Sequence, residues 1–100
     1  MRFNYKNNDY ELAELKEPND RATFDIIAIF RIDYCIWQGE NLVTVDKKTY
    51  EESEDHFEKL IFVDYFYGAD FDNDYLIKSA KNSIDFIESR KKEMKVIKLH

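Results

Sequence analysis

Apolar and polar residues alternate along the first half of the chain, as in strands that bury one face. Phe3 and Tyr5 precede a polar stretch, Asn7-Asn8-Asp9, and the alternation resumes at Tyr10 and Leu12. This arrangement predicts a β-hairpin whose turn lies in the polar stretch. The segment EPND around Pro18 predicts a loop, because proline donates no hydrogen bond to a strand ladder.

The longest alternating stretch covers residues 24–37 and predicts a long strand. Its odd positions mix charged residues with Ile27, Ile29 and Trp37, which indicates partial cover by a helix or an exposed binding surface. Its even positions are all apolar, so we expect that face to be buried throughout: Phe24, Ile26, Ala28, Phe30, Ile32, Tyr34 and Ile36. A turn at Gly39 and a second strand at 42–45 complete a second hairpin.

Two helices are predicted after the second hairpin. Thr49, followed three residues later by Glu52, matches a capping box and predicts a helix that begins there. Residues 56–67 fit either a helical stripe or a buried strand, and Gly68 at the position after a helix end favours the helix. A long amphipathic helix is predicted from Asp74 onward by a stripe of Leu76, Ala80, Ser83, Ile84, Ile87 and Lys91.

The composition predicts one domain over residues 1–100, since the chain has one Pro, two Gly and no linker. The expected fold is α+β: an antiparallel sheet of about four strands, in two hairpins over residues 1–46, packed by two carboxy-terminal helices. A lone Cys35 allows no intramolecular disulfide, and no apolar run follows a basic start. We therefore expect a cytoplasmic protein that does not bind a membrane.

Charge is distributed unevenly along the chain, which carries a net charge of −6. Residues 49–76 contain one basic and nine acidic side chains, a net charge of −8. Residues 77–100 contain seven basic and three acidic side chains, a net charge of +4. This polarity predicts either internal compensation between the two segments or an electronegative surface that attracts a cationic partner.

No metal or cofactor is expected. Asp70, Asp72 and Asp74 alternate as in a calcium loop, but the sixth position is Tyr75 rather than Gly and the twelfth is Lys81 rather than Glu. One Cys and two His cannot form a structural zinc site without carboxylates. Two isolated glycines form no phosphate-binding loop.

Catalytic groups are not singled out by their spacing, so we expect no enzymatic activity. Cys35 lies inside an apolar strand, which is typical of a buried thiol. His56 lies in an acidic segment, and no carboxylate pair is distinguished from the many others. Direct nucleic-acid binding is not expected from an acidic chain, because the basic run near the carboxyl end is typical of a helix terminus.

The resulting hypothesis is a non-catalytic acidic binding module that docks on a basic partner, such as a nuclease or a DNA-binding protein. Small acidic α+β domains of this composition are common among immunity proteins, antitoxins and phage-encoded inhibitors, an analogy of composition only. The residues expected to steer the partner are Glu51, Glu52, Glu54, Asp55 and Glu58. Those expected in close contact are Tyr67, Asp70, Asp72, Asp74 and Tyr75. Two alternatives stay open. One is a small carboxylate- or metal-dependent hydrolase, and the other is an oligomerising structural subunit that pairs through a sheet edge or through the mixed face around Ile27, Ile29 and Trp37.

Overall fold

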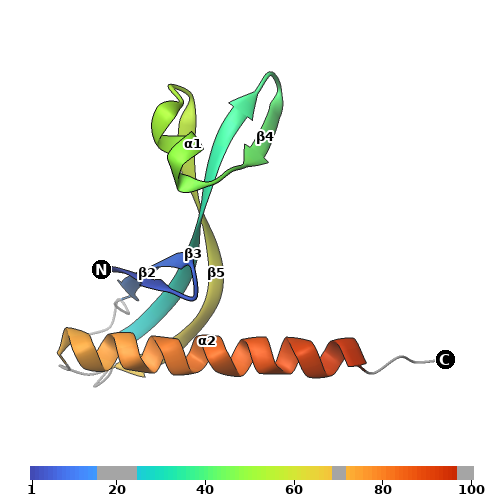
Figure 1. Cartoon of the computed structure of the whole chain (residues 1–100). Coiled ribbons are helices and arrows are strands. Elements are labelled where there is room, and N and C mark those ends of the chain that lie inside the picture. The colour runs from blue at the N-terminus through green and yellow to red at the C-terminus, as the bar shows by residue number, and fades with distance from the viewer. Residues whose placement is uncertain (16–24, 69–71, 97–100) are drawn as a thin grey trace.

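The computed structural model describes residues 1–15, 25–68 and 72–96 of the chain (Figure 1). The described elements, in chain order, are β1 (Arg2–Tyr5), β2 (Asn8–Leu15), β3 (Asp25–Gln38), β4 (Asn41–Thr44), α1 (Lys47–Glu52), β5 (His56–Gly68) and α2 (Asn73–Val96). All described strand pairs are antiparallel. β2 and β4 pair with successive parts of one side of β3, β1 pairs with the outer side of β2, and β5 pairs with the other side of β3. The predicted α+β class with an antiparallel sheet is confirmed, with five strands in place of about four.

The first predicted hairpin is confirmed as β1 and β2, which pair from Arg2 with Glu11 to Tyr5 with Asn8. Its turn lies at Lys6 and Asn7, whose φ angles are 50° and 66°. Two consecutive positive φ angles match the right-handed twist of the flanking strands, as in type I′ hairpins. The turn therefore begins one residue earlier than the Asn7-Asn8-Asp9 stretch suggested. The loop expected around Pro18 lies outside the described residues.

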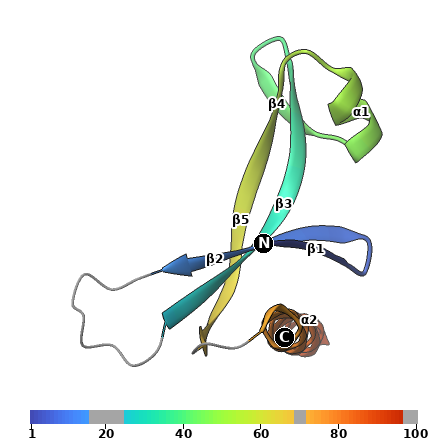
Figure 2. The same cartoon turned by 90° about the vertical axis from the view of Figure 1, so that its left-hand side faces the viewer.

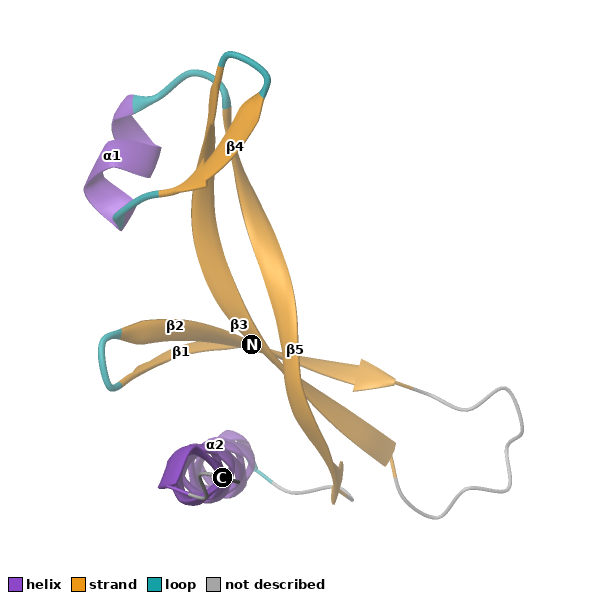
Figure 3. Cartoon of the chain, turned by 90° about the vertical axis from the view of Figure 1, so that its right-hand side faces the viewer, coloured by secondary structure: helices purple, strands orange, loops and turns teal. Residues whose placement is uncertain are grey.

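The second predicted hairpin is also confirmed. β3 is a strand of 14 residues at the centre of the sheet, and β4 pairs with its last residues, from Cys35 with Thr44 to Gln38 with Asn41. The turn contains Gly39 at a φ of 65°, a conformation that glycine adopts without steric cost. β4 and α1 lie at the far end of the β3–β5 ribbon from α2 (Figures 1 and 3).

The prediction of a helix over residues 56–67 was wrong, because this segment forms the strand β5. It pairs with β3 from Asp25 with Gly68 to Ile36 with His56. Its aromatic and β-branched residues suit a pleated sheet, and pairing along β3 supplies the ladder that local helix propensity cannot match. The register shifts between Ile29 and Phe30, which pair with Asp64 and Phe62, so Val63 is an extra residue in a β-bulge.

The prediction of two carboxy-terminal helices was also wrong, since α2 is the one long helix in the described part of the second half of the chain. The other helix, α1, has six residues and starts at Lys47 rather than Thr49. Asp46 caps it by accepting a hydrogen bond of 2.7 Å from the backbone N–H of Thr49. A short acidic side chain thus performs the capping that the Thr49 and Glu52 pair suggested. Ser53 follows in an extended conformation that leads into β5.

The predicted amphipathic helix is confirmed as α2, which has 24 residues and lies across the base of the sheet below the β1–β2 hairpin (Figure 2). Asp72 caps it by accepting a hydrogen bond of 2.8 Å from the backbone N–H of Tyr75. Its apolar stripe packs on one face of the sheet. The buried core consists of Tyr10, Leu12, Ile27, Ile29, Ala80 and Ile84.

The helix covers the odd positions Ile27 and Ile29 of β3, and the expectation of a continuously buried even face was wrong. Ile27 and Ile29 lie against α2, and Ile29 is 0% exposed. On the even face Ala28 and Ile32 are buried, whereas Ile26, Phe30, Tyr34 and Ile36 are only half-buried. Charges on the odd face do not prevent the packing, because Arg31 and Asp33 pair with each other at 3.0 Å beyond the core. Phe24 lies outside the described residues.

Candidate functional site

The sheet face opposite α2 carries a group of large apolar side chains. Directly opposite residues of antiparallel strands project to the same face of the sheet. Because Ile27 and Ile29 face the helix, the alternate positions of β3 and their partners face away from it. The pairs on this face are Ile26 with Tyr67, Ala28 with Tyr65, Phe30 with Phe62, and Ile32 with Leu60, and Leu15 of β2 lies opposite Ile26.

We call five exposed residues of this face the β5 aromatic face: Leu15, Leu60, Phe62, Tyr65 and Tyr67. Phe62 is 57% exposed and Tyr67 is 64% exposed. The five side chains expose about 500 Å² of mostly apolar surface, taking about 200 Å² for a whole aromatic side chain. An apolar patch of this size is at the upper end for a monomer and commonly marks a binding surface.

The rings of the β5 aromatic face are ordered by contacts with neighbouring rings. Phe62 packs edge-on against Phe30 with ring centroids 5.9 Å apart. Tyr65 and Tyr67 form a second edge-to-face pair, also with centroids 5.9 Å apart. Such pairs fix side-chain orientation, so the face is preorganised for contact with a partner.

The free edge of β5 adjoins this face. β5 pairs with β3 along one side, and among the described residues no strand pairs with its other side. The strand has 13 residues. At about 3.3 Å per residue it is about 40 Å long. A long edge of this kind presents unpaired backbone N–H and C=O groups, which are a template for pairing with another chain.

The acidic residues predicted as one site fall into two groups at opposite ends of β5. At the distal end, beside α1, lie four exposed acids: Glu51, Glu52, Glu54 and Asp55. At the base, where α2 begins, lie exposed Asp72, Asp74 and Tyr75. The length of β5 separates the two groups, so they do not form one continuous patch (Figure 1). Asp70 lies outside the described residues.

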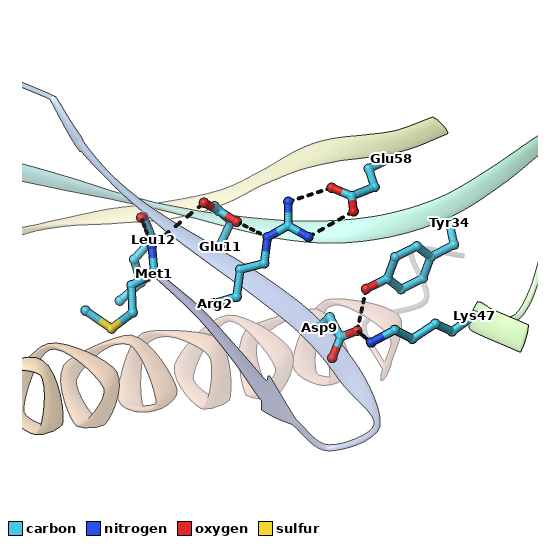
Figure 4. A network of polar contacts seen from close by, with 8 residues as sticks. All are labelled: Met1, Arg2, Asp9, Glu11, Leu12, Tyr34, Lys47 and Glu58. Carbon is cyan, nitrogen blue, oxygen red and sulfur yellow. Dashed lines mark hydrogen bonds and ion pairs between the residues drawn. The ribbon is translucent and has the colours of Figure 1, made fainter. Parts of the chain in front are cut away.

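The remaining predicted site residues, Glu58 and Tyr67, belong to β5 itself. Tyr67 is part of the β5 aromatic face. Glu58 accepts two hydrogen bonds from the Arg2 guanidinium, at 2.9 and 2.6 Å, and Arg2 also contacts Glu11 at 2.5 Å (Figure 4). The paired guanidinium lowers the pKa of Glu58. The charge of Glu58 is therefore already matched within the chain.

A polar cleft of about 400 Å³ lies beside the β1–β2 turn and the start of α1. Asp9 accepts a hydrogen bond of 2.5 Å from the Tyr34 hydroxyl and lies 3.6 Å from Lys47 Nζ (Figure 4). Hydrogen bonds from Tyr34 and Asn4 lower the pKa of Asp9. Burial and the bond to Asp9 raise the pKa of Tyr34. The cleft thus holds an ionised carboxylate whose partners come from the chain itself.

Two described basic side chains of α2 form contacts with aromatic rings rather than ion pairs with the acids of α1 and β5. Lys81 lies over the ring of Tyr5 at 5.3 Å, and Arg90 lies over the ring of Phe86 at 5.7 Å. The helix instead contacts the β1–β2 hairpin through Asp85. Its carboxylate accepts hydrogen bonds from the Tyr5 hydroxyl and forms an ion pair with Lys6 at 2.7 Å. Among residues 1–15, 26–68 and 72–91, whose side chains the structure describes, no ion pair joins a cation of α2 to an acid of α1 or β5.

Metal-ligating side chains and the one thiol bear on whether the described residues could perform chemistry. No cluster of three or more metal-ligating side chains occurs within residues 1–15, 25–68 and 72–96. Cys35 is 1% exposed. Its Sγ lies 3.9 Å from the hydroxyl of Thr44, the arrangement of a buried structural thiol.

Comparison with known proteins gives no family for this fold and site. No protein-family model, no curated protein and no solved structure matches the chain. None of the described helices is both long and apolar enough to cross a bilayer. The described residues define an α+β protein in which one long helix packs against one face of a five-stranded antiparallel sheet at its base and leaves aromatic residues exposed on the other face.

Proposed function

We propose that the protein is a non-catalytic binding module that docks a basic partner protein on the β5 aromatic face, as an inhibitor of the immunity, antitoxin or phage anti-defence type. The observation that carries the proposal is the exposure of Leu60, Phe62, Tyr65 and Tyr67 on the sheet face that α2 does not cover. Such exposure costs solubility, which a binding function explains.

The chemistry of the face suits a protein partner. Exposed, mutually packed aromatic rings are the residues that dominate binding energy in protein interfaces. A stable interface buries about 800 Å² on each partner. The β5 aromatic face supplies about 500 Å² of apolar centre. The strand edge and the acidic groups beside it supply a polar rim, as interfaces of this size require.

Charge favours a cationic partner over a second copy of the chain. Acids flank β5 at both ends, so any chain laid along the strand meets negative charge at each terminus. In an antiparallel pair of copies, the acids beside α1 would oppose the acids at the start of α2, and a parallel pair would place like groups together. A basic surface is instead attracted at both ends, which accelerates encounter and disfavours wrong partners. Nucleases and DNA-binding proteins present such surfaces, because they must bind phosphate.

Two matched substitutions test the proposal. Phe62 on β5 and Phe86 on α2 are 57% and 61% exposed, so Phe62→Ala and Phe86→Ala remove similar side chains from opposite sides of the protein. Tagged wild type is expected to retain a basic protein from native lysate at about 50 mM salt and to release it at about 500 mM. Phe62→Ala is expected to lose this protein, and Phe86→Ala to retain it. Capture that is insensitive to salt, or equal for the two variants, would contradict the proposal.

A further inference from the structure

The β5 aromatic face ends at an unpaired strand edge, and this edge carries a more specific inference that rests on the proposed function. We propose that the basic partner contributes an extended segment that adds to β5 as a sixth strand of the sheet. The segment has apolar side chains at alternate positions and Lys or Arg near both ends. Backbone hydrogen bonds provide its affinity and the alternate side chains its specificity, as in other cases of strand addition.

The length and polarity of the edge define this occupant. β5 has 13 residues, and among the described elements its outer side is not paired. Side chains of an added strand would project alternately to the two faces of the sheet. Those on the uncovered face would extend the row of Phe62, Tyr65 and Tyr67, whose rings already stand exposed.

The opposite face also has room for a side chain. A cleft of about 160 Å³ lies between α2 and the sheet. Its aliphatic lining includes Ile61 and Val63 of β5 and Ile84 and Ile87 of α2, and its polar lining includes Tyr10, Arg31, Glu88 and Lys91. An apolar side chain of the added strand would meet aliphatic groups there. The uncovered face beside β5 therefore favours apolar residues in the central part of the segment, whereas the helix side offers both aliphatic and charged groups.

Charge specifies the ends of the segment. Glu54 and Asp55 precede the first residue of β5, and Asp72 and Asp74 follow its last residue after a short connection. β5 itself carries Lys59 between Glu58 and Asp64, so it offers little positive charge to repel a cation. Natural edges are commonly protected by several Lys residues or a Pro, and β5 contains one Lys and no Pro. The edge thus rejects acidic strands and its own copy, and it accepts a strand with basic ends.

The bulge at Val63 divides the edge into two runs. β5 is in one register with β3 from His56 to Phe62 and in another from Asp64 to Gly68. An added strand would pair in one run or contain a matching irregularity. We therefore expect strong pairing on one side of Val63 and weaker pairing on the other.

Amide hydrogen exchange with synthetic peptides tests the inference on the intact chain. The first probe is a peptide as long as β5 that alternates Val and Thr between paired Lys residues at its ends. The second replaces each Lys with Glu, and the third keeps the Lys residues but carries N-methyl groups at alternate amides, which removes donors from one edge. The Lys peptide is expected to protect every second amide of β5 on at least one side of Val63. The Glu peptide is expected to bind at least about tenfold more weakly, and the methylated peptide to give no alternate protection when its modified edge is the pairing one.

Several results would overturn this binding mode. They are failure of the Lys peptide to bind at millimolar concentration, equal binding of the Lys and Glu peptides, and shifts of the aromatic resonances without alternate amide protection. Protection in the free chain that increases with protein concentration would identify a second copy as the occupant. Each of these results leaves the proposed function standing if Phe62→Ala still abolishes capture of the basic protein. Equal capture by Phe62→Ala and Phe86→Ala would instead remove the proposed function itself.

Discussion

Ile29 and Ile26 both belong to β3 but project to opposite faces of the sheet, so truncating each of them tests which face is the core. Ile29 is 0% exposed and packs with Ala80 and Ile84 of α2. Ile26 is half-buried on the face that carries Tyr67. The structure therefore predicts a much larger loss of stability for Ile29→Ala than for Ile26→Ala.

The magnitudes follow from burial. Replacing a fully buried Ile with Ala removes its transfer free energy and leaves a cavity, at a cost of about 4 kcal/mol. At Ile26 the neighbours can relax toward solvent and leave no closed cavity, so the loss is about 1.5 kcal/mol. A chain of this size has a free energy of unfolding of about 5–15 kcal/mol. Both variants should therefore stay folded, with a difference between them of about 2.5 kcal/mol.

Equilibrium unfolding in urea, followed by far-ultraviolet circular dichroism and by Trp37 fluorescence, measures the difference. The two probes should give one transition, and the dependence on urea should be the same for both variants, so that midpoints convert directly to free energies. Equal losses, or a larger loss for Ile26→Ala, would refute the assignment. A larger loss for Ile26→Ala would place the core on the even face of β3, where the β5 aromatic face would then not be exposed.

Three further predictions concern single residues. The hydrogen bond from Tyr34 lowers the pKa of Asp9. This bond therefore stabilises the fold at pH values above the ordinary carboxyl pKa, and its contribution is lost as the pH falls through the lowered pKa of Asp9. Tyr34→Phe should therefore lower the urea midpoint of unfolding at neutral pH. It should also reduce the difference between the midpoints at pH values of about 7 and 3, and a larger difference than in the wild type would count against the assignment. Gly39→Ala should cost about 1 kcal/mol in thermal unfolding, because φ is 65° there and nothing else lies within 4 Å, and no change would argue against this turn. Cys35, at 1% exposed, should react with a thiol reagent only as fast as the native chain opens, and rapid native-state labelling would contradict its burial.

The two hairpins and α2 were predictable because each has a period that extends over several turns or residue pairs. The alternation at Phe3, Tyr5, Tyr10 and Leu12 is satisfied by local pairing, and the stripe from Leu76 continues for more than four helical turns. β5 was not predictable in this way. Its run of aromatic and β-branched residues fits either period, and the choice depends on pairing with β3, which is distant in the chain.

The candidate site was predicted only in part for the same reason. The exposed acids were identified, but the strand that separates them into two groups was not. The β5 aromatic face depends on the bulge at Val63. Leu60 and Phe62 are at even positions and Tyr65 and Tyr67 at odd ones, so they share a face only because one extra residue lies between the two pairs. No periodic pattern in the sequence reveals such an insertion.

The measurement that tests the central claim most directly is hydroxyl-radical footprinting of the chain with and without its captured basic partner. The account predicts that oxidation of Phe62, Tyr65 and Tyr67 falls strongly in the complex. Oxidation of Phe86, which is equally exposed on the opposite side, should stay unchanged. Protection of Phe86 with continued oxidation of the β5 rings would place the partner on α2 and contradict the account.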